Sequence, residues 1–200
     1  KNATVPFING CDNSYHPCQI LADALTILEK FGTLDVNLMY IGAKNNVFNS
    51  HVEFFSKMKK GTLYGLTPLV NETACGPDFY EEAKKSGHYI ELDPAMSMEE
   101  AKEYANKMDV LYTDTWVDME FFNNPAYQKQ KEETLAKMMP YQLNGDFTKD
   151  SKAIVFHDMP MHVGFEISQD VVDKNLDHIL DEAENRRHAE KAVMYTLLNS

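Results

Sequence analysis

The chain has 200 residues, of which 44% are hydrophobic and 25% charged, and its net charge at pH 7 is −12. These values are typical of a globular protein with one large or two small domains, and the acidic balance excludes a basic surface for nucleic acids or anionic membranes. No run approaches the roughly 20 apolar residues of a membrane span, and the first residues lack a signal-peptide core. We therefore expect a cytoplasmic protein with reduced thiols, because Cys11, Cys18 and Cys75 lack metal-type spacing. A start at Lys1 without methionine suggests a fragment or a processed chain.

Short apolar runs alternate with amphipathic stretches along the chain. In chain order, the pattern first predicts a helix over Pro17–Phe31 ending at Gly32, a strand over 36–41, a helix over 46–59 and a strand over 63–66. A helix over 78–86 and a strand over 89–92 follow, and the next helix begins at the capping box of Ser97 and Glu100. The last predicted elements are strands over Val110–Thr113 and 153–156 and a closing helix over 183–198. This alternation predicts one α/β domain over residues 1–200, a doubly wound, mostly parallel, Rossmann-like sheet with helices on both faces.

Polar residues follow three of the predicted strands, in segments 42–46, 114–120 and 157–160. In open α/β sheets, ligands bind beyond the carboxyl ends of the strands. The sequence therefore predicts a polar site where these three segments meet.

His16 precedes Pro17, and proline is common at the first position of a helix. His16 is therefore predicted to cap the helix over Pro17–Phe31, where free N–H groups and the helix dipole favour an oxygen-rich or anionic ligand. The alternative is a surface His-Pro cap without function, which this pair alone would favour.

Five ordered segments of the chain resemble the second half of the ornithine carbamoyltransferases. They read HPCQILADALTILEKFG, IGAKNN, DVLYTDTWV, HDMP and AENRRHAEKAVM, where the family has HPxQ, a GxxNN turn, DTWVSMG, HCLP and ENR. The resemblance spans nearly the whole chain and favours the ornithine branch over the aspartate branch. It implies carbamoyl transfer from carbamoyl phosphate to an amine such as ornithine, which gives a ureido product such as citrulline and phosphate, with no cofactor or metal.

The resemblance also assigns roles to residues. It implies that His16 donates to the carbamoyl oxygen, that Gln19 contacts the carbamoyl amide, and that Arg186 supplies a fixed fork of donors. Arg186 in a terminal helix would otherwise be interpreted as a solvated charge.

For the amine substrate, the resemblance implies that Asn46 bonds the backbone groups of ornithine. Asp114 would receive the α-amino group, and Met119 would close over it. The alternatives are that Asn45 and Asn46 only form a turn or cap. Trp116 is expected to pack in the core.

The chain departs from the family pattern at HCLP, which here reads HDMP. Met159 in place of leucine is a mild apolar change, but Asp158 stands where the family has a cysteine beside the reacting amine. A carboxylate there would raise the pKa of the amine and oppose the neutral nucleophile. Alternatively, Asp158 could accept the amine's proton if nearby Asp114 raised its own pKa.

The substrate loop departs as well, because the family's SMG is Asp118-Met119-Glu120 here. Together with Asp158, this adds three carboxylates around the expected amine pocket. The hypothesis that follows is a substrate more cationic than ornithine, or a homologue without catalysis that serves as an amino-acid-binding module.

The family's phosphate-binding Ser-Thr-Arg-Thr motif does not occur in this sequence. The chain therefore resembles the amino-acid-binding half alone, and by itself it should bind carbamoyl phosphate poorly. The family's first half makes most of the trimer contacts, so we expect a homotrimer for the full-length protein, whereas this piece could be monomeric.

Two further readings carry little weight. Zinc hydrolysis through His157, Asp158 and His162 has no second cluster of metal-type ligands to support it. A dinucleotide site would need GxGxxG, whereas the turn after the strand over 36–41 offers Gly42 alone.

Overall fold

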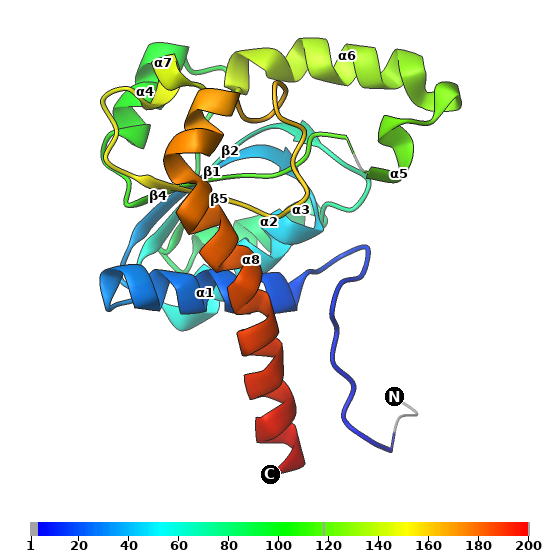
Figure 1. The fold of residues 1–200 in the computed structure, drawn as a ribbon, viewed down its shortest axis with the longest axis vertical. Helices are drawn as coiled ribbons and strands as arrows, with labels where there is room; N and C mark the ends of the chain where they lie inside the picture. Colours follow the sequence, from blue (N-terminus) through cyan, green and yellow to red (C-terminus); the bar gives the residue numbers. More distant parts are fainter. Residues whose placement is uncertain (1–3, 118, 200) are drawn as a thin grey trace.

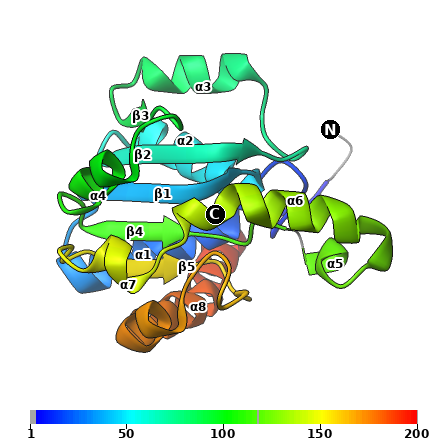
Figure 2. The ribbon, with the colours of Figure 1, turned by 90° about the horizontal axis from the view of Figure 1, so that it is seen from above.

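The computed structural model describes residues 4–117 and 119–199, with the backbone alone at Met119 and Glu120. Within these ranges lies a parallel five-stranded sheet with the order β3-β2-β1-β4-β5 (Figure 2). Its strands are β1 (Asn37–Lys44), β2 (Thr62–Val70), β3 (Tyr89–Glu91), β4 (Val110–Thr113) and β5 (Ile154–His157). The chain therefore builds outward from β1 to β3, returns to the other side of β1 with β4, and ends at β5.

Helices connect the strands and cover both faces of the sheet (Figure 1). They are α1 (Pro17–Phe31), α2 (Asn46–Met58), α3 (Pro77–Lys84), α4 (Met98–Ala105), α5 (Met119–Phe122), α6 (Gln128–Met138), α7 (Gly145–Thr148) and α8 (Gln169–Leu198), with the short 3-10 helices η1 (Pro125–Tyr127) and η2 (Met139–Tyr141) beside α6. No helix in the described ranges is long and apolar enough to cross a membrane.

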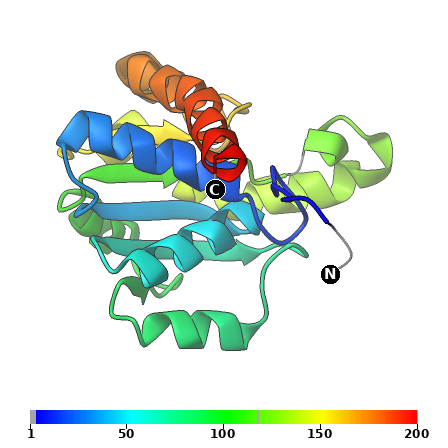
Figure 3. The same ribbon diagram turned by 90° about the horizontal axis from the view of Figure 1, so that it is seen from below.

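Alternate residues of each strand face two separate cores, as the period of a strand requires. On one face, Tyr40 and Tyr112 pack with α1, α2 and α3. On the other, Ile41 and Leu111 pack with α4, α7 and α8. Figure 3 shows α8 crossing α1 at the β5 side of the sheet. The predicted doubly wound α/β class is confirmed.

Two glycines explain close local geometry. Gly32 ends α1 in the left-handed conformation with φ 70°, where its N–H bonds the carbonyl of Leu28. Gly65 in β2 lets Phe48 of α2 approach the sheet, because a Cβ atom there would lie 2.6 Å from the ring. The absence of a side chain at Gly65 therefore allows α2 to pack closely against β2.

Four predictions about the elements need correction. The strand predicted over 36–41 continues to Lys44, so Gly42 lies in β1 and not in a turn, at a shift in the register with β2. Likewise β2 extends to Val70. The closing helix begins at Gln169, fourteen positions before residue 183, because the apolar residues Val171, Val172 and Ile179 pack on the sheet despite several poor helix formers between them. The helix α6 was missed, since only Met138 of its eleven residues is buried and no apolar stripe marks it.

Candidate active site

A polar hollow lies at the carboxyl ends of β1, β4 and β5, where the strand order reverses on either side of β1. Its volume is about 200 Å³. The residues lining it are His16, Asn45, Asn46, Val47, Asp114, Thr115, Asp158, Met159 and Pro160. The three polar segments predicted to meet do so here.

Asn45 links the start of α2 to the acid that follows β4. Its side-chain oxygen accepts the N–H of Phe48 and so caps α2, while its Nδ2 donates to Asp114 at 2.7 Å. Asp114 also accepts the N–H of Thr115 at 2.6 Å. Burial raises the pKa of Asp114, although its bonds to Asn45 and Thr115 oppose the rise. Asn45 is therefore both a cap and a partner of the acid.

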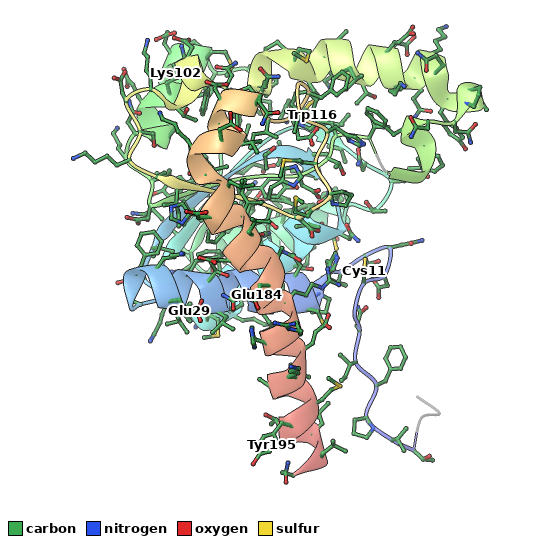
Figure 4. All side chains as sticks on the ribbon, in the orientation of Figure 1. Cys11, Glu29, Lys102, Trp116, Glu184 and Tyr195 are labelled. Atoms are coloured by element: carbon green, nitrogen blue, oxygen red, sulfur yellow. The ribbon has the colours of Figure 1, made fainter. Side chains whose placement is uncertain are left out.

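Asn46 lines the hollow but is engaged elsewhere in this state. Its Nδ2 donates to the carbonyl of Asp12 at 2.8 Å and to Sγ of Cys11 at 3.5 Å. Figure 4 shows Cys11 at the bend of the N-terminal segment, close to the start of α1. A ligand bound by Asn46 would have to replace these bonds.

Arg186 comes together with His16 and Gln19 although it lies 170 and 167 positions further along the sequence. Nη1 of Arg186 lies 3.2 Å from Nε2 of His16 and donates to Oε1 of Gln19 at 3.4 Å. His16 is the N-cap of α1, as predicted, with Pro17 behind it and its own N–H bonded to Ser50. The crossing of α8 over α1 thus delivers three polar groups to one end of the hollow.

Burial dominates the charge state of this end of the hollow. It lowers the pKa of His16 to about 4, helped by the positive charge of Arg186. It raises the pKa of Asp158 to about 9, helped by the neighbouring carboxyl groups of Asp114 and Asp23. Nε2 of His16 and Oδ2 of Asp158 are 3.8 Å apart, but near pH 7 both groups are neutral, so the contact is not an ion pair.

A buried polar network lies behind Gln19 and was missed at the sequence level. Gln19 donates to Asp23 at 2.9 Å and to Glu182 at 3.0 Å, and both acids are buried. The signal was present: Asp23 lies four residues after Gln19, and Glu182 four residues before Arg186, so each pair shares a helix face.

The histidine of HDMP has a structural partner. Nε2 of His157 lies 3.2 Å from Oε1 of Glu166, which also accepts the N–H of His162. In the part of the chain that the structure describes, no group of three His, Cys, Asp or Glu side chains could hold a metal ion. The zinc interpretation through His157, Asp158 and His162 therefore lacks a ligand set among these residues.

Of the predicted substrate residues, Asn46, Asp114 and Met159 line the hollow. Asp118 lies outside the described residues, as do the side chains of Met119 and Glu120. A neighbouring hollow of about 400 Å³ lies between the loop after β2, Trp116 and α6, and its described lining contains none of the predicted catalytic residues. Trp116 is buried, as expected of a packing residue.

Fold and site together define a doubly wound α/β domain with a polar ligand site at the switch point of its sheet. Residues 34–197 match the family model of the aspartate/ornithine carbamoyltransferase Asp/Orn binding domain. The chain therefore belongs to the aspartate/ornithine carbamoyltransferase family, and the predicted resemblance is confirmed.

Individual relatives agree with this assignment. The chain is 36% identical to an ornithine carbamoyltransferase of Chlorobaculum tepidum, with 100% of the chain and 56% of that protein covered. It is 37% identical to one of Pyrococcus horikoshii, at 99% and 60% coverage. The solved structure of the ornithine carbamoyltransferase from Pyrococcus furiosus matches with a TM-score of 0.77 and 34% identity over 96% of this chain and 59% of that one. The chain thus spans a little over half the length of these relatives.

Proposed function

We propose that this chain is the amino-acid-binding half of an ornithine-type carbamoyltransferase. The full-length protein would carry a carbamoyl-phosphate-binding half before it and transfer the carbamoyl group to the side-chain amine of ornithine or a related amine. The family resemblance further supports a cytoplasmic homotrimer that acts in arginine metabolism. The observation that carries the proposal is the convergence of His16, Gln19 and Arg186 beside the hollow that holds Asp114.

The donor side needs groups that stabilise negative charge on the carbonyl oxygen in the tetrahedral transition state. Arg186 supplies a permanent cation, and neutral His16 can donate a hydrogen bond without carrying charge. Nη1 of Arg186 donates to Nε2 of His16 in the unliganded protein. A bound carbamoyl oxygen would take over this bond from Arg186, and His16 would then donate to the oxygen from Nε2 in its other neutral tautomer. Gln19 presents its carbonyl oxygen on the same side and would accept from the carbamoyl NH₂ group.

The amine side uses the residues at the strand ends. Asp114 would receive the α-amino group and Asn46 would bond the backbone groups of the amino acid. Asp118, Met119 and Met159 would contact the rest of the substrate. The exposed position of Met159 on the rim supports contact with a ligand that enters from solvent.

In the reaction, the neutral amine nitrogen attacks the carbonyl carbon and forms a C–N bond. The bond from that carbon to the phosphate oxygen then breaks, and phosphate leaves with the electron pair. Conversion of the bound ammonium group into the ureido nitrogen releases two protons. We assign removal of the first, which makes the amine neutral, to Asp158, because a bound ammonium group favours the ionised carboxyl and burial then favours return of the proton to it. The second proton is released after attack and leaves with the departing phosphate.

The second candidate is an amino-acid-binding module without transfer. The presence of Asp158 in place of the family cysteine favours it, as do Asp118 and Glu120 in the substrate loop. Such a module would use the same hollow and bind the amine as a cation.

The test is an assay of the full-length protein with carbamoyl phosphate and a panel that runs from ornithine to more cationic amines. Rapid formation of citrulline supports the ornithine assignment, and transfer only to another amine relocates the specificity to the added carboxylates. Absence of transfer to every amine by folded protein, with ornithine binding retained in calorimetry, would support the binding module.

A further inference from the structure

The amide of Gln19 has a fixed orientation. Its Nε2 uses both hydrogens, one to Oδ1 of Asp23 at 2.9 Å and one to Oε1 of Glu182 at 3.0 Å. Its Oε1 therefore points the other way, to within 3.4 Å of Nη1 of Arg186. Rotating the amide by half a turn would bring its oxygen against the oxygens of two buried acids, which is unfavourable.

The position of one proton follows from the neighbours of Asp23. Nδ1 of His51 lies 3.1 Å from the carbonyl oxygen of Val47, so Nδ1 carries the hydrogen. In neutral His51 the other nitrogen, Nε2, then presents a lone pair, and it lies 3.1 Å from Oδ2 of Asp23. Neither of these two atoms has a hydrogen-bond partner elsewhere. Two lone pairs at this distance repel, so a proton must lie between them.

Both oxygens of Glu182 accept hydrogen bonds. Its Oε1 accepts from Gln19, and its Oε2 accepts the N–H of His157 at 2.9 Å. Burial raises the pKa of Glu182 and raises that of Asp23 to about 7, whereas it lowers the pKa of His51 to about 4. Two buried carboxyls this close do not ionise together. The contact between Oδ2 of Asp23 and Nε2 of His51 needs one proton, and because the pKa of His51 is the lower of the two, that proton lies on Asp23.

We propose that Asp23 and Glu182 are positioning residues that hold the carbonyl oxygen of Gln19 toward the active site, where it accepts the NH₂ group of the carbamoyl donor. The proposal rests on the proposed function for the identity of that donor. A carbamoyl NH₂ offers only hydrogens, so it requires an oxygen, and a reversed glutamine would oppose it with its own NH₂. The buried acids would thus select a carbamoyl group over an acyl group that lacks the NH₂.

The decisive variants are Asp23→Asn and Asp23→Leu in the full-length protein. Asparagine reproduces the protonated acid, because its Oδ1 can accept from Gln19 while its Nδ2 donates to His51. We expect Asp23→Asn to keep the KM for carbamoyl phosphate within about threefold. Asp23→Leu should raise that KM about tenfold or more, with little change in the KM for the amine.

Acetyl phosphate provides the specificity readout, because a methyl group replaces the NH₂ of the donor. The preference for carbamoyl phosphate over acetyl phosphate should fall about tenfold or more in Asp23→Leu and persist in Asp23→Asn. The matched control is Thr26→Val, which removes a buried hydroxyl from the same face of α1 without touching Gln19. Thr26→Val should lower the stability of the protein and leave unchanged both the KM for carbamoyl phosphate and the preference for carbamoyl phosphate over acetyl phosphate. Equal losses in Asp23→Asn and Asp23→Leu would overturn the proposal, since an anion would then be required.

A measurement on the unmodified 200-residue chain separates this proposal from the proposed function. The ionisable groups that face Asp23 are His51 from α2, Tyr112 from β4, Glu182 and Arg186 from α8, and Asp158 after β5. In ¹⁵N spectra of histidine-labelled protein, His51 should be neutral at pH 7 with its hydrogen on Nδ1. A doubly protonated His51 at pH 7 would contradict the assigned proton, whether or not any carbamoyl transfer is detected.

Discussion

Asp158 is a residue of the candidate site at which this chain departs from the family pattern, because a carboxyl group stands there in place of the family's cysteine. Its carboxyl is only 12% exposed and shares its surroundings with Asp114 and the buried pair of Asp23 and Glu182. Burial and these neighbours raise its pKa to about 9. The structure therefore favours the second of the two roles considered for this residue, that of a group able to accept a proton from the amine.

The pH dependence of transfer should report Asp158 directly. The reactive complex holds one proton shared between the carboxyl, with a pKa of about 9, and an amine with a pKa of ~10.4. The kcat/KM for the amine should therefore rise toward pH 9 and fall above roughly pH 10. His16, with a pKa of about 4, adds no limb in this range.

In Asp158→Asn, kcat/KM at pH 9 should fall by about 10²–10⁴-fold. Its profile should follow the neutral amine alone and keep rising to the highest pH at which the protein stays folded. Rates of citrulline formation between pH 6 and 10.5 provide the comparison. An unchanged profile in the variant would remove Asp158 from the proton transfer.

The same residue should cost stability. The pKa of Asp158 is 3.8 in the unfolded chain and about 9 in the folded one, so both states are protonated below pH 3.8. As pH rises from there to 9, the unfolded state ionises first, and the free energy of unfolding declines. Asp158→Asn should be more stable than the wild type by about 1–2 kcal/mol at pH 8 and equally stable at pH 3.5.

Urea unfolding at the two pH values measures this difference. The control is Asp150→Asn, an exposed aspartate outside the site, which should change stability equally little at both. A variant Asp158→Asn that is less stable than the wild type at pH 8 would mean that the carboxyl has a favourable partner in the folded protein.

At the scale of elements, helix starts supply much of the site. His16 lies at the start of α1 and Asn45 at the start of α2. Ser50 links the two helix starts, because it accepts from the N–H of His16 and donates to the carbonyl of Asn46. Capping and ligand positioning therefore depend on the same backbone geometry. A change in a cap should affect both.

Asn45→Ala removes the side-chain cap of α2 and the donor to Asp114. We expect the free energy of unfolding to fall by about 1–2 kcal/mol and ornithine binding to weaken, because Asp114 loses a partner that orients it. Ser97→Ala, which removes the capping box of α4 far from the hollow, should match the stability loss and leave binding unchanged. Chemical denaturation and calorimetry with ornithine measure the two effects, and intact binding in Asn45→Ala would assign Asn45 to capping alone.

The elements that could be predicted from sequence are those whose signals are local. The helix over Pro17–Phe31 was correct at both ends, because Pro17 and Gly32 mark its start and stop, and the capping box of Ser97 gave the start of α4. Parallel strands can also be recognised in the sequence as short apolar runs, as in Val110–Thr113. By contrast, α6 has no buried stripe, and the first half of α8 is helical because of tertiary packing.

The candidate site divides in the same way. Residues within motifs, such as His16 and Asp114, were found because the motifs are contiguous in sequence. Asp23, His51 and Glu182 were missed because their role depends on three helices meeting at Gln19. Their ionisation depends on burial, which the sequence does not encode locally.

At the scale of the whole molecule, α8 connects the sheet to the outside. The first half of α8 packs on β5, and its middle crosses α1 near Glu29 of α1 and Glu184 of α8 (Figure 4). Its last turns extend beyond the sheet, where Tyr195 and Leu198 are exposed. The N-terminal segment extends in the same direction (Figure 1). Among the described residues, the hollow is lined by Asn46, Asp114 and Met159, which are proposed to bind the amine, whereas of the three residues proposed to bind the donor His16 alone lines it.

This asymmetry predicts how the isolated chain would bind the two substrates of the proposed reaction. The chain carries a net charge of −12 and no Ser-Thr-Arg-Thr motif, and among the described side chains at the site Arg186 is the one cation that a dianionic carbamoyl phosphate would meet. We expect no binding of carbamoyl phosphate by calorimetry up to a concentration of about 1 mM, corresponding to less than about 4 kcal/mol of binding free energy. The full-length protein should bind it at least tenfold more tightly, because backbone N–H groups and additional cations would then surround the phosphate.

The matched comparison is inorganic phosphate titrated into both proteins at 20 and 200 mM salt, since general charge repulsion would weaken with salt whereas a missing site would not. Tight binding of carbamoyl phosphate by the 200-residue chain, abolished by Arg186→Ala, would mean that this domain holds a complete donor site and that the preceding half serves another purpose.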